Sequence, residues 1–260
     1  MTRSNFLSVR QEGHVLIVTL NRPDVLNALH VAAHVECADV FDRFARDGGL
    51  RVAIVTGAGD RAFCVGNDLK HQAGGGPVRL PASGFAGLTN RFDLDKPVIA
   101  AVNGLALGGG FEAALACDII VAARNAQFGL PEPRVGMAAL AGGLLRLPHS
   151  IGPKRAMPLI LTGRRISAEE GHGLGFVSEL TGTGQALEAA LALAHEIAAC
   201  SPSAIRAAKQ VVRTGSDMPL PQALAAQDDM PAVKAMRASP DYAEGPRAFS
   251  EKRKPIWRDE

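Results

Sequence analysis

Four short runs of apolar, largely β-branched residues alternate with stretches of helical spacing in the first half of the chain. The runs are HVLIVTL (14–20), RVAIVT (51–56), KPVIAAV (96–102) and DIIVAA (118–123), each bounded by turn-forming residues. Residues 27–46 and the short, Ala-rich stretch 109–117 lie between them and favour helices. Buried strands alternating with helices are typical of a sheet with crossover connections. The sequence therefore predicts an α/β fold.

From about residue 143 the pattern changes to helices. Helical segments are expected over residues 152–163, 185–200, 201–213, 221–237 and 240–250. Ser167, with Glu170 three residues later, forms the pattern of a capping box. Pro158 and Pro231 fall inside two of the segments, so we expect a kink or a split there. We predict an α/β core over residues 1–195 and a C-terminal helical region over residues 196–260.

Composition, charge and cysteine spacing limit the classes of protein to which the chain can belong. The chain has 260 residues, 47% of them apolar and 21% charged, with a formal net charge of +2, which fits a globular protein without a nucleic-acid footprint. No apolar signal core precedes the first strand, and no apolar window reaches the ~20 residues of a membrane span. The four cysteines are far apart and lack metal-ligand spacing. We expect a cytoplasmic protein with no metal and with four small buried cysteine side chains.

Two glycine-rich stretches can be compared with known nucleotide-binding motifs. VAIVTGAGDRAF is a strand followed by a glycine turn, but a dinucleotide fingerprint starting at Gly57 requires a glycine where Ala62 stands. No P-loop motif occurs in the chain. A nicotinamide-dependent oxidoreductase is therefore disfavoured. The GGGPV tract that begins at Gly74 indicates a flexible loop.

The stretch LALGGGFEAALACD, residues 105–118, behaves differently. A strand ends before it and a helix begins near Gly109, so free N–H groups and the positive end of the helix dipole face whatever lies in front. Glycine lets a ligand oxygen approach the backbone, and Glu112 follows in the first turn. The alternative interpretation is close helix packing through glycines beside an exposed glutamate.

A second carboxylate favours the catalytic interpretation. In AQFGLPEPRVG, Glu132 lies in a Pro-flanked loop after the strand at residues 118–123. This connection can return Glu132 to the edge of the sheet where the helix at residue 109 begins. Paired carboxylates beside a backbone donor form a general acid/base pair next to an oxyanion hole.

At these residues the chain resembles the enoyl-CoA hydratase/isomerase, or crotonase, family. The similarity runs in order through NRPDVLNAL (21–29), VTGAGDRAFCVGNDLK (55–70), the segments 96–136 and 142–180, and the tail EGPRAFSEKRKPIW (244–257). The resemblance implies a crotonase-like ββα spiral core followed by the C-terminal helical region. It also implies a coenzyme A thioester as substrate, no additional cofactor, and a homotrimer or homohexamer.

Functional residues follow from the same resemblance. The oxyanion hole maps to the backbone N–H groups of Asn67 and Gly109, and the two catalytic glutamates map to Glu112 and Glu132. With both glutamates present, the resemblance implies hydration of a 2-enoyl-CoA to a 3-hydroxyacyl-CoA, or the reverse. Glu112 acts on the water and Glu132 delivers the proton to C2. Substrate and coenzyme A contacts are expected at Val25, Asn67, Asp68, Leu69, Lys70, Gly109, Phe249 and Lys252.

Some residues depart from the common hydratase pattern. Asp24 stands where many relatives carry a basic residue, and Leu140 stands where a glycine often shapes the acyl pocket. The GGLLRLP run resembles the branch of the family that handles carnitinyl-CoA, so dehydration of a substituted acyl-CoA is the alternative reaction. An RNA-binding branch presents a lysine-rich helix. Here the corresponding residues 31–47 carry a net charge of −2, from four acidic and two Arg side chains, which argues against RNA binding.

Overall fold

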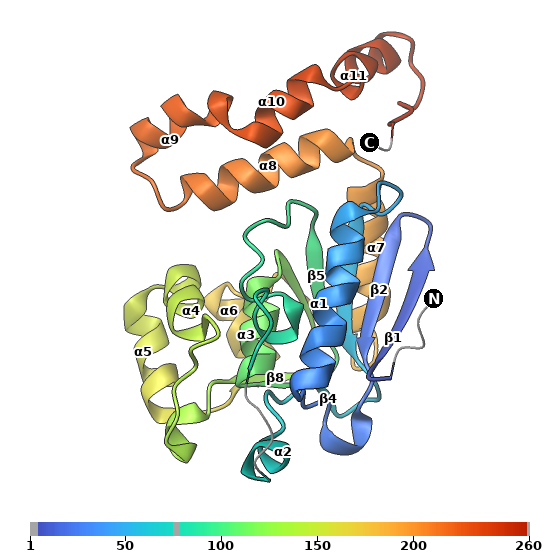
Figure 1. Ribbon diagram of the computed structural model, residues 1–260. Helices are drawn as coiled ribbons and strands as arrows, with labels where there is room; N and C mark the ends of the chain where they lie inside the picture. The colour runs from blue at the N-terminus through green and yellow to red at the C-terminus, as the bar shows by residue number, and fades with distance from the viewer. Residues whose placement is uncertain (1–4, 75–78, 259–260) are drawn as a thin grey trace.

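The structure, a computed structural model, describes residues 5–74 and 79–258 and contains two sheets (Figure 1). The larger sheet has the strand order β1-β2-β3-β5-β7-β10, and the smaller one, at one end of it, has the order β4-β6-β8-β9. All pairs are parallel except β1 with β2 and β8 with β9. The strands are β1 Leu7–Glu12, β2 Val15–Leu20, β3 Val52–Gly57, β4 Ala62–Cys64, β5 Val98–Val102, β6 Leu105–Leu107, β7 Ile119–Ala123, β8 Gln127–Gly129, β9 Ile166–Ser167 and β10 Glu179–Thr181. The predicted α/β class is confirmed.

The four predicted strands are β2, β3, β5 and β7, which are neighbours at the centre of the larger sheet. Their sequences are continuous apolar runs because helices cover both faces of the larger sheet. On one face, Ala186, Ala190, Ala194 and Ala198 form a stripe along α7 (Ala186–Ala198) that packs on alternate strand residues such as Ile54. On the other face, α1 (Val31–Arg46) packs in the main core.

The chain passes repeatedly from the larger sheet to the smaller one. β3 leads to β4, β5 to β6 and β7 to β8, so the small sheet repeats the parallel order of the large one. The short helix α2 (Leu69–Ala73) follows β4, α3 (Gly109–Ala116) follows β6, and the single turn η3 (Glu132–Val135) follows β8. This strand–strand–helix succession agrees with the spiral core that the resemblance implied.

The strands of the small sheet and both edge strands of the large one were not predicted from the sequence. β4, β6 and β8 have three residues each, and β9 has two, so their length is below what periodicity can detect. β1, at one edge of the large sheet, is buried only at Leu7, so it lacks the apolar run that predicted the central strands. The loop predicted for the GGGPV tract lies outside the described residues except for Gly74.

Most predicted helices are present. After η1 (Pro23–Val25), η2 (Phe85–Gly87) and the elements above come α4 Gly143–Ile151, α5 Pro153–Thr162, α6 Ala168–Leu174, α8 Pro202–Gly215, α9 Leu220–Ala226, η4 Gln227–Asp229, α10 Pro231–Ala238 and α11 Asp241–Ser250. The segment 221–237 divides as expected, with Pro231 at the start of α10. Pro158 leaves α5 unsplit. Ser167 accepts from the Glu170 N–H at 3.1 Å, whereas the Glu170 carboxylate pairs with Arg164.

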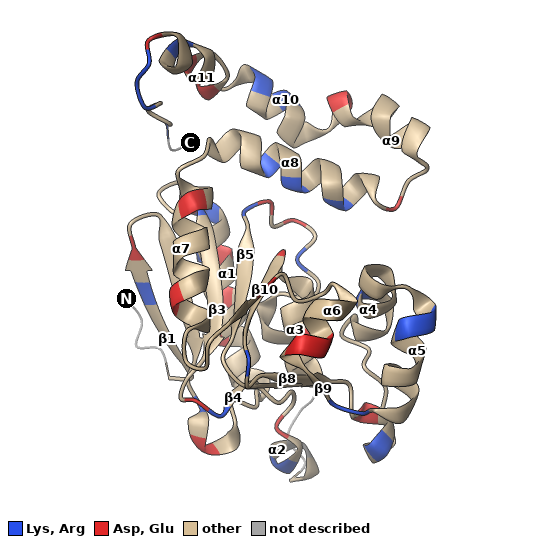
Figure 2. Ribbon diagram, turned by 180° about the vertical axis from the view of Figure 1, so that it is seen from behind, with Lys and Arg blue, Asp and Glu red and all other residues tan. Residues whose placement is uncertain are grey.

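Helices α8 to α11 form a lobe beside the sheets, with a small core of Ala207, Met230 and Val233 (Figure 1). Basic residues line α8, as Figure 2 shows. One of them, Lys209, attaches the lobe to the core, since its Nζ donates at 2.8 Å both to Asp118 Oδ2 and to the carbonyl of Lys96. No helix in the described part of the chain is both long enough and apolar enough to span a bilayer.

Gly87 provides a test of how tightly η2 packs on α1. Its φ is +66°, and a Cβ there would lie 2.7 Å from the Ala38 nitrogen. Gly13 has a similar φ of +57°, but no described atom lies within 4 Å of a Cβ. In urea unfolding, Gly13→Ala should lower the free energy of unfolding by about 1 kcal/mol, which is the strain of the left-handed conformation alone. Gly87→Ala should cost about 3 kcal/mol or more, because overpacking adds to that strain. Equal losses would contradict this packing.

Candidate active site

Three loops meet at one edge of the small sheet. Asn67 follows β4, Gly109 follows β6 and Glu132 follows β8. These strands are parallel neighbours, so their carboxyl ends share an edge and the residues after them are brought together. Residues that are 65 positions apart along the chain therefore become neighbours for a topological reason.

The loops border an open cavity of about 270 Å³. Asn67, Gly109, Glu112, Glu132 and Leu69, all predicted site residues, lie on its wall. The other lining residues are Val65, Gly66, Leu80, Phe85, Gly108, Pro131, Val135, Met137, Ala138, Leu140 and Ala141. The wall is therefore mainly apolar, with a few convergent polar groups, which is the usual character of a small-molecule site.

The Gly109 N–H belongs to the first residue of α3 and has no carbonyl one turn earlier to bind. Within the described residues it donates no backbone hydrogen bond. The backbone of another glycine approaches it, since a Cβ on Gly66 would lie 3.1 Å from this nitrogen. The dipole of α3 adds partial positive charge at the same place.

The Asn67 N–H is oriented by its neighbours on both sides. Leu29 N donates to the Gly66 carbonyl and Asp68 N donates to the Leu29 carbonyl, both at 2.9 Å. Because the C=O and N–H of a trans peptide point in opposite directions, the N–H in the Gly66–Asn67 peptide points away from Leu29. No described backbone oxygen accepts from it. Two unpaired N–H groups are thus available at the same cavity.

Each glycine of the 108–110 triplet has its own packing reason. A Cβ on Gly110 would overlap the Cys64 carbonyl, and one on Gly109 would overlap the Phe85 ring. Gly108 has a φ of +54°, and a Cβ there would lie 2.9 Å from Glu132 Oε1. The second carboxylate therefore lies directly against the triplet, and packing constrains all three positions.

Glu112 is 3% exposed, and its Oε1 accepts from the Gly143 N–H at 2.8 Å. Burial, with a smaller contribution from the negative charge of Glu132, raises the pKa of Glu112 to about 7 against the lowering effect of the Gly143 hydrogen bond. A carboxyl group with such a pKa can exchange a proton near neutral pH. Gly143 was not predicted from the sequence, although Gly142 and Gly143 stand at the start of α4 as Gly108 and Gly109 stand at the start of α3.

Glu132 begins η3, and its Oε2 is buried without a hydrogen-bond partner among the described residues. Burial also raises the pKa of this carboxyl, mainly through loss of hydration. A buried, unpaired carboxyl oxygen on a cavity wall is costly to the fold and suited to a proton-transfer role.

The sequence matches the family described as enoyl-CoA hydratase/isomerase over residues 10–260. The chain belongs to this family. A carnitinyl-CoA dehydratase of Escherichia coli K12 is 43% identical over 98% of this chain and 99% of its own length. An enoyl-CoA hydratase of Mycobacterium tuberculosis H37Rv has a similar structure, with a TM-score of 0.92 and 43% identity over 98% of this chain and 99% of that one. Another from Mycobacterium marinum has a TM-score of 0.91 and 45% identity, covering 97% and 98% of the two chains.

Membership of the enoyl-CoA hydratase/isomerase family confirms the resemblance seen in the sequence, and the chain is accordingly an enzyme of the crotonase type. Its fold matches crotonase structures at a TM-score near 0.9. No three His, Cys, Asp or Glu side chains converge as a metal site within the described residues.

The residues predicted to contact coenzyme A fall into two groups. Asp68 and Lys70 adjoin the cavity loop, and Asp68 forms an ion pair of 3.0 Å with Arg22, just before η1. Phe249, which is 88% exposed, belongs to α11, and Lys252 follows α11 by two residues. Figures 1 and 2 show α11 in the C-terminal lobe, at the opposite end of the molecule from α2. One subunit alone does not bring the two groups together.

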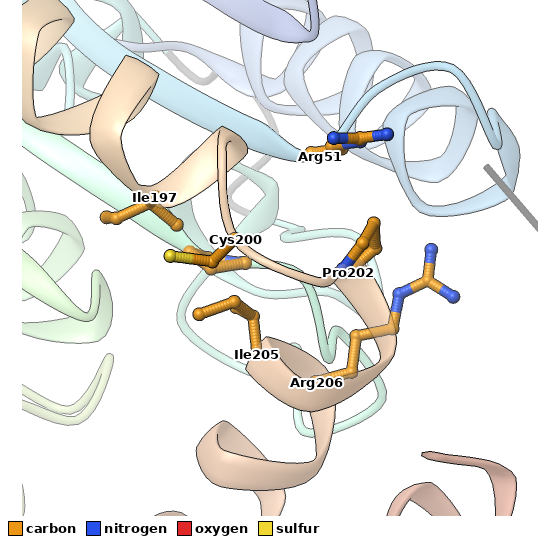
Figure 3. A pocket seen from close by; sticks show the side chains of 7 residues that line it. Arg51, Ile197, Cys200, Pro202, Ile205 and Arg206 are labelled. Carbon is orange, nitrogen blue, oxygen red and sulfur yellow. The ribbon is translucent and has the colours of Figure 1, made fainter. Parts of the chain in front are cut away.

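A second hollow lies between the end of α7 and α8 (Figure 3). Cys200 and Ile205 line it, with Arg51 and Arg206 beside them, but its volume of about 10 Å³ has room for no more than one water. It is therefore not a substrate site.

The expectation that all four cysteines are buried is wrong for Cys200, which is exposed because it follows the last buried turn of α7. It is only in part right for Cys117, which is half-buried.

The raised pKa of Glu112 predicts how stability depends on pH. Below about pH 4.5 the Glu112 side chain is neutral in both the folded and the unfolded chain. Between pH 4.5 and about pH 7 it ionises only in the unfolded chain, so the free energy of unfolding falls as the pH rises. Glu112→Gln stays neutral and keeps an oxygen for Gly143. In urea unfolding, the free energy of unfolding of this variant, relative to that of the native chain, should rise by roughly 3 kcal/mol between pH 4.5 and pH 8. A difference that does not change with pH would contradict burial of an ionisable carboxyl.

Proposed function

We propose that this enzyme is an enoyl-CoA hydratase, which adds water reversibly to a 2-enoyl-CoA to give a 3-hydroxyacyl-CoA. The observation that supports it is the meeting of buried Glu112, half-buried Glu132 and two unpaired N–H groups on one cavity wall. The coenzyme A thioester is the substrate, and the reaction needs no further cofactor.

In this proposal the thioester oxygen accepts hydrogen bonds from the N–H groups of Asn67 and Gly109. Negative charge grows on that oxygen when water adds to C3, because the electrons of the double bond move toward the carbonyl. Donors already fixed in place stabilise the charge without reorganising, and one such donor is typically worth about 3 kcal/mol of the barrier. The dipole of α3 acts in the same direction.

The glutamates divide the proton transfers. Ionised Glu112 takes a proton from the attacking water while its oxygen adds to C3. Protonated Glu132 donates to C2 as the enolate collapses. Water has then been added across the double bond, and one proton has moved from Glu132 to Glu112; its return restores the enzyme. Burial raises the pKa of both carboxyls, that of Glu112 to about 7, and a raised pKa suits a group that takes up and releases a proton.

Dehydration of carnitinyl-CoA is the second candidate, because relatives with that name are 43% identical to this chain. A trimethylammonium group is normally bound by several aromatic faces or by a carboxylate. Here Phe85 is the only aromatic residue on the described wall, and its only acidic residues are the two glutamates that the proposed proton transfers already use. Val135, Met137 and Leu140 make the remaining wall apolar. We therefore favour an uncharged acyl chain.

We also propose that Phe249 and Lys252 of one subunit reach the coenzyme A bound to another, in a homotrimer or homohexamer. The high exposure of Phe249 and the distance of the lobe from its own cavity support this arrangement.

The glutamate assignment predicts large losses of activity. Glu112→Gln and Glu132→Gln should each lower kcat for crotonyl-CoA hydration by about 10² to 10⁴, since each removes one proton transfer. The loss of absorbance of the enoyl thioester gives the rate. Glu170→Gln is a matched control, because Glu170 pairs with Arg164 outside the cavity, and it should leave kcat unchanged. Full activity in either cavity variant would disprove the assignment.

The apolar wall predicts substrate choice. The kcat/KM for crotonyl-CoA hydration should exceed that for carnitinyl-CoA dehydration by at least about tenfold, because an unpaired cation is costly to bury. Both reactions can be followed at the enoyl-thioester absorbance band. A preference for carnitinyl-CoA would replace the proposed function by the second candidate.

A further inference from the structure

His34 is a buried, titratable residue to which the proposed mechanism gives no role. It lies in the first turn of α1 and is 1% exposed. Both ring nitrogens have partners: the Ala86 N–H donates to Nδ1 at 3.2 Å, and Nε2 lies 3.3 Å from Asn67 Oδ1. A buried histidine thus connects α1 with η2 and with the loop that carries one of the unpaired N–H groups.

The contacts of His34 determine its protonation. Because Ala86 donates to Nδ1, that nitrogen carries no proton in this arrangement. Burial lowers the pKa of His34 to about 4, so the ring is neutral near pH 7 and its one proton is on Nε2. Nε2–H therefore donates to Asn67 Oδ1, and this bond fixes the rotation of the Asn67 amide.

His34 also contacts η2, which packs beside Gly109, the residue that carries the second N–H group. Its ring packs on Phe85 with a centroid separation of 4.5 Å and an interplanar angle of 65°. The Phe85 ring occupies the space that a Cβ on Gly109 would need. Phe85 is held in turn by its N–H, which donates to Thr89 Oγ1 at 2.8 Å.

We propose that His34 is a positioning residue that holds the Asn67 and Gly109 N–H groups at the separation needed to bind one thioester oxygen. The proposal rests on the proposed function, since it assumes that these groups bind that oxygen. Hydrogen bonds through Leu29 hold the Asn67 loop at its backbone, and His34 holds it at its side chain. The same ring supports Gly109 through Phe85.

The test compares His34→Asn with His34→Gln. Asparagine is too short to reach Asn67, whereas glutamine can place an amide N–H near the former Nε2. His34→Asn should lower kcat for crotonyl-CoA by about tenfold or more with KM nearly unchanged, because the misplaced donors act most strongly in the transition state. His34→Gln should recover much of the loss.

A spectroscopic measurement separates positioning from general damage to the fold. Bound butyryl-CoA, which cannot be hydrated, should show a thioester carbonyl stretch shifted to lower frequency in the native enzyme. His34→Asn and Asn67→Ala should both reduce that shift, since they break the same bond from opposite sides. Asn67 is exposed, so its substitution removes little packing. Cys37→Ala is the control: Cys37 is buried in α1 one turn further on, and the variant should keep the native shift.

The outcomes are distinct. Folded His34→Asn and Asn67→Ala enzymes with native kcat and an undiminished carbonyl shift would overturn the role of His34. A native enzyme that shifts the butyryl-CoA carbonyl but does not hydrate crotonyl-CoA would refute the proposed function instead, and the effect of His34 on the shift would still decide the positioning role.

Discussion

The parallel pairing of β4, β6 and β8 is the constraint on which the site depends. Each strand has only three residues, yet pairing fixes the direction in which the chain leaves it. The loop of Asn67, the start of α3 and the turn of Glu132 then converge without any covalent link. The larger sheet makes this possible because β3, β5 and β7 deliver the three strands in the same order and at the same spacing.

Close backbone contact completes the arrangement. Glycines allow the Asn67 loop to lie on the start of α3, and Phe85 fills the space beside Gly109. The two N–H groups remain unpaired because one opens a helix and the other is directed away by bonds made through its neighbours. Unpaired donors and a buried carboxyl oxygen lower the stability of a fold, so their concentration on one cavity wall supports the proposed binding site.

The sequence predicted the central strands well, since β2, β3, β5 and β7 are apolar on both faces and need no tertiary information to be recognised. Pro231 likewise fixes a helix start through its own ring. The small sheet escaped detection because a three-residue strand has no period. Gly143 and His34 were missed for another reason: their importance comes from contacts with Glu112 and Asn67, which are distant in sequence.

By itself the sequence determined the α/β class, the family resemblance and the identity of the two glutamates, because apolar periodicity and long ordered motifs are properties of the chain alone. Only the tertiary structure decided that Glu112 and Glu132 share a cavity, that burial raises the pKa of each, and that a neutral His34 holds the Asn67 side chain. Burial, charge proximity and hydrogen-bond direction depend on how distant segments meet, and a linear pattern does not contain that information.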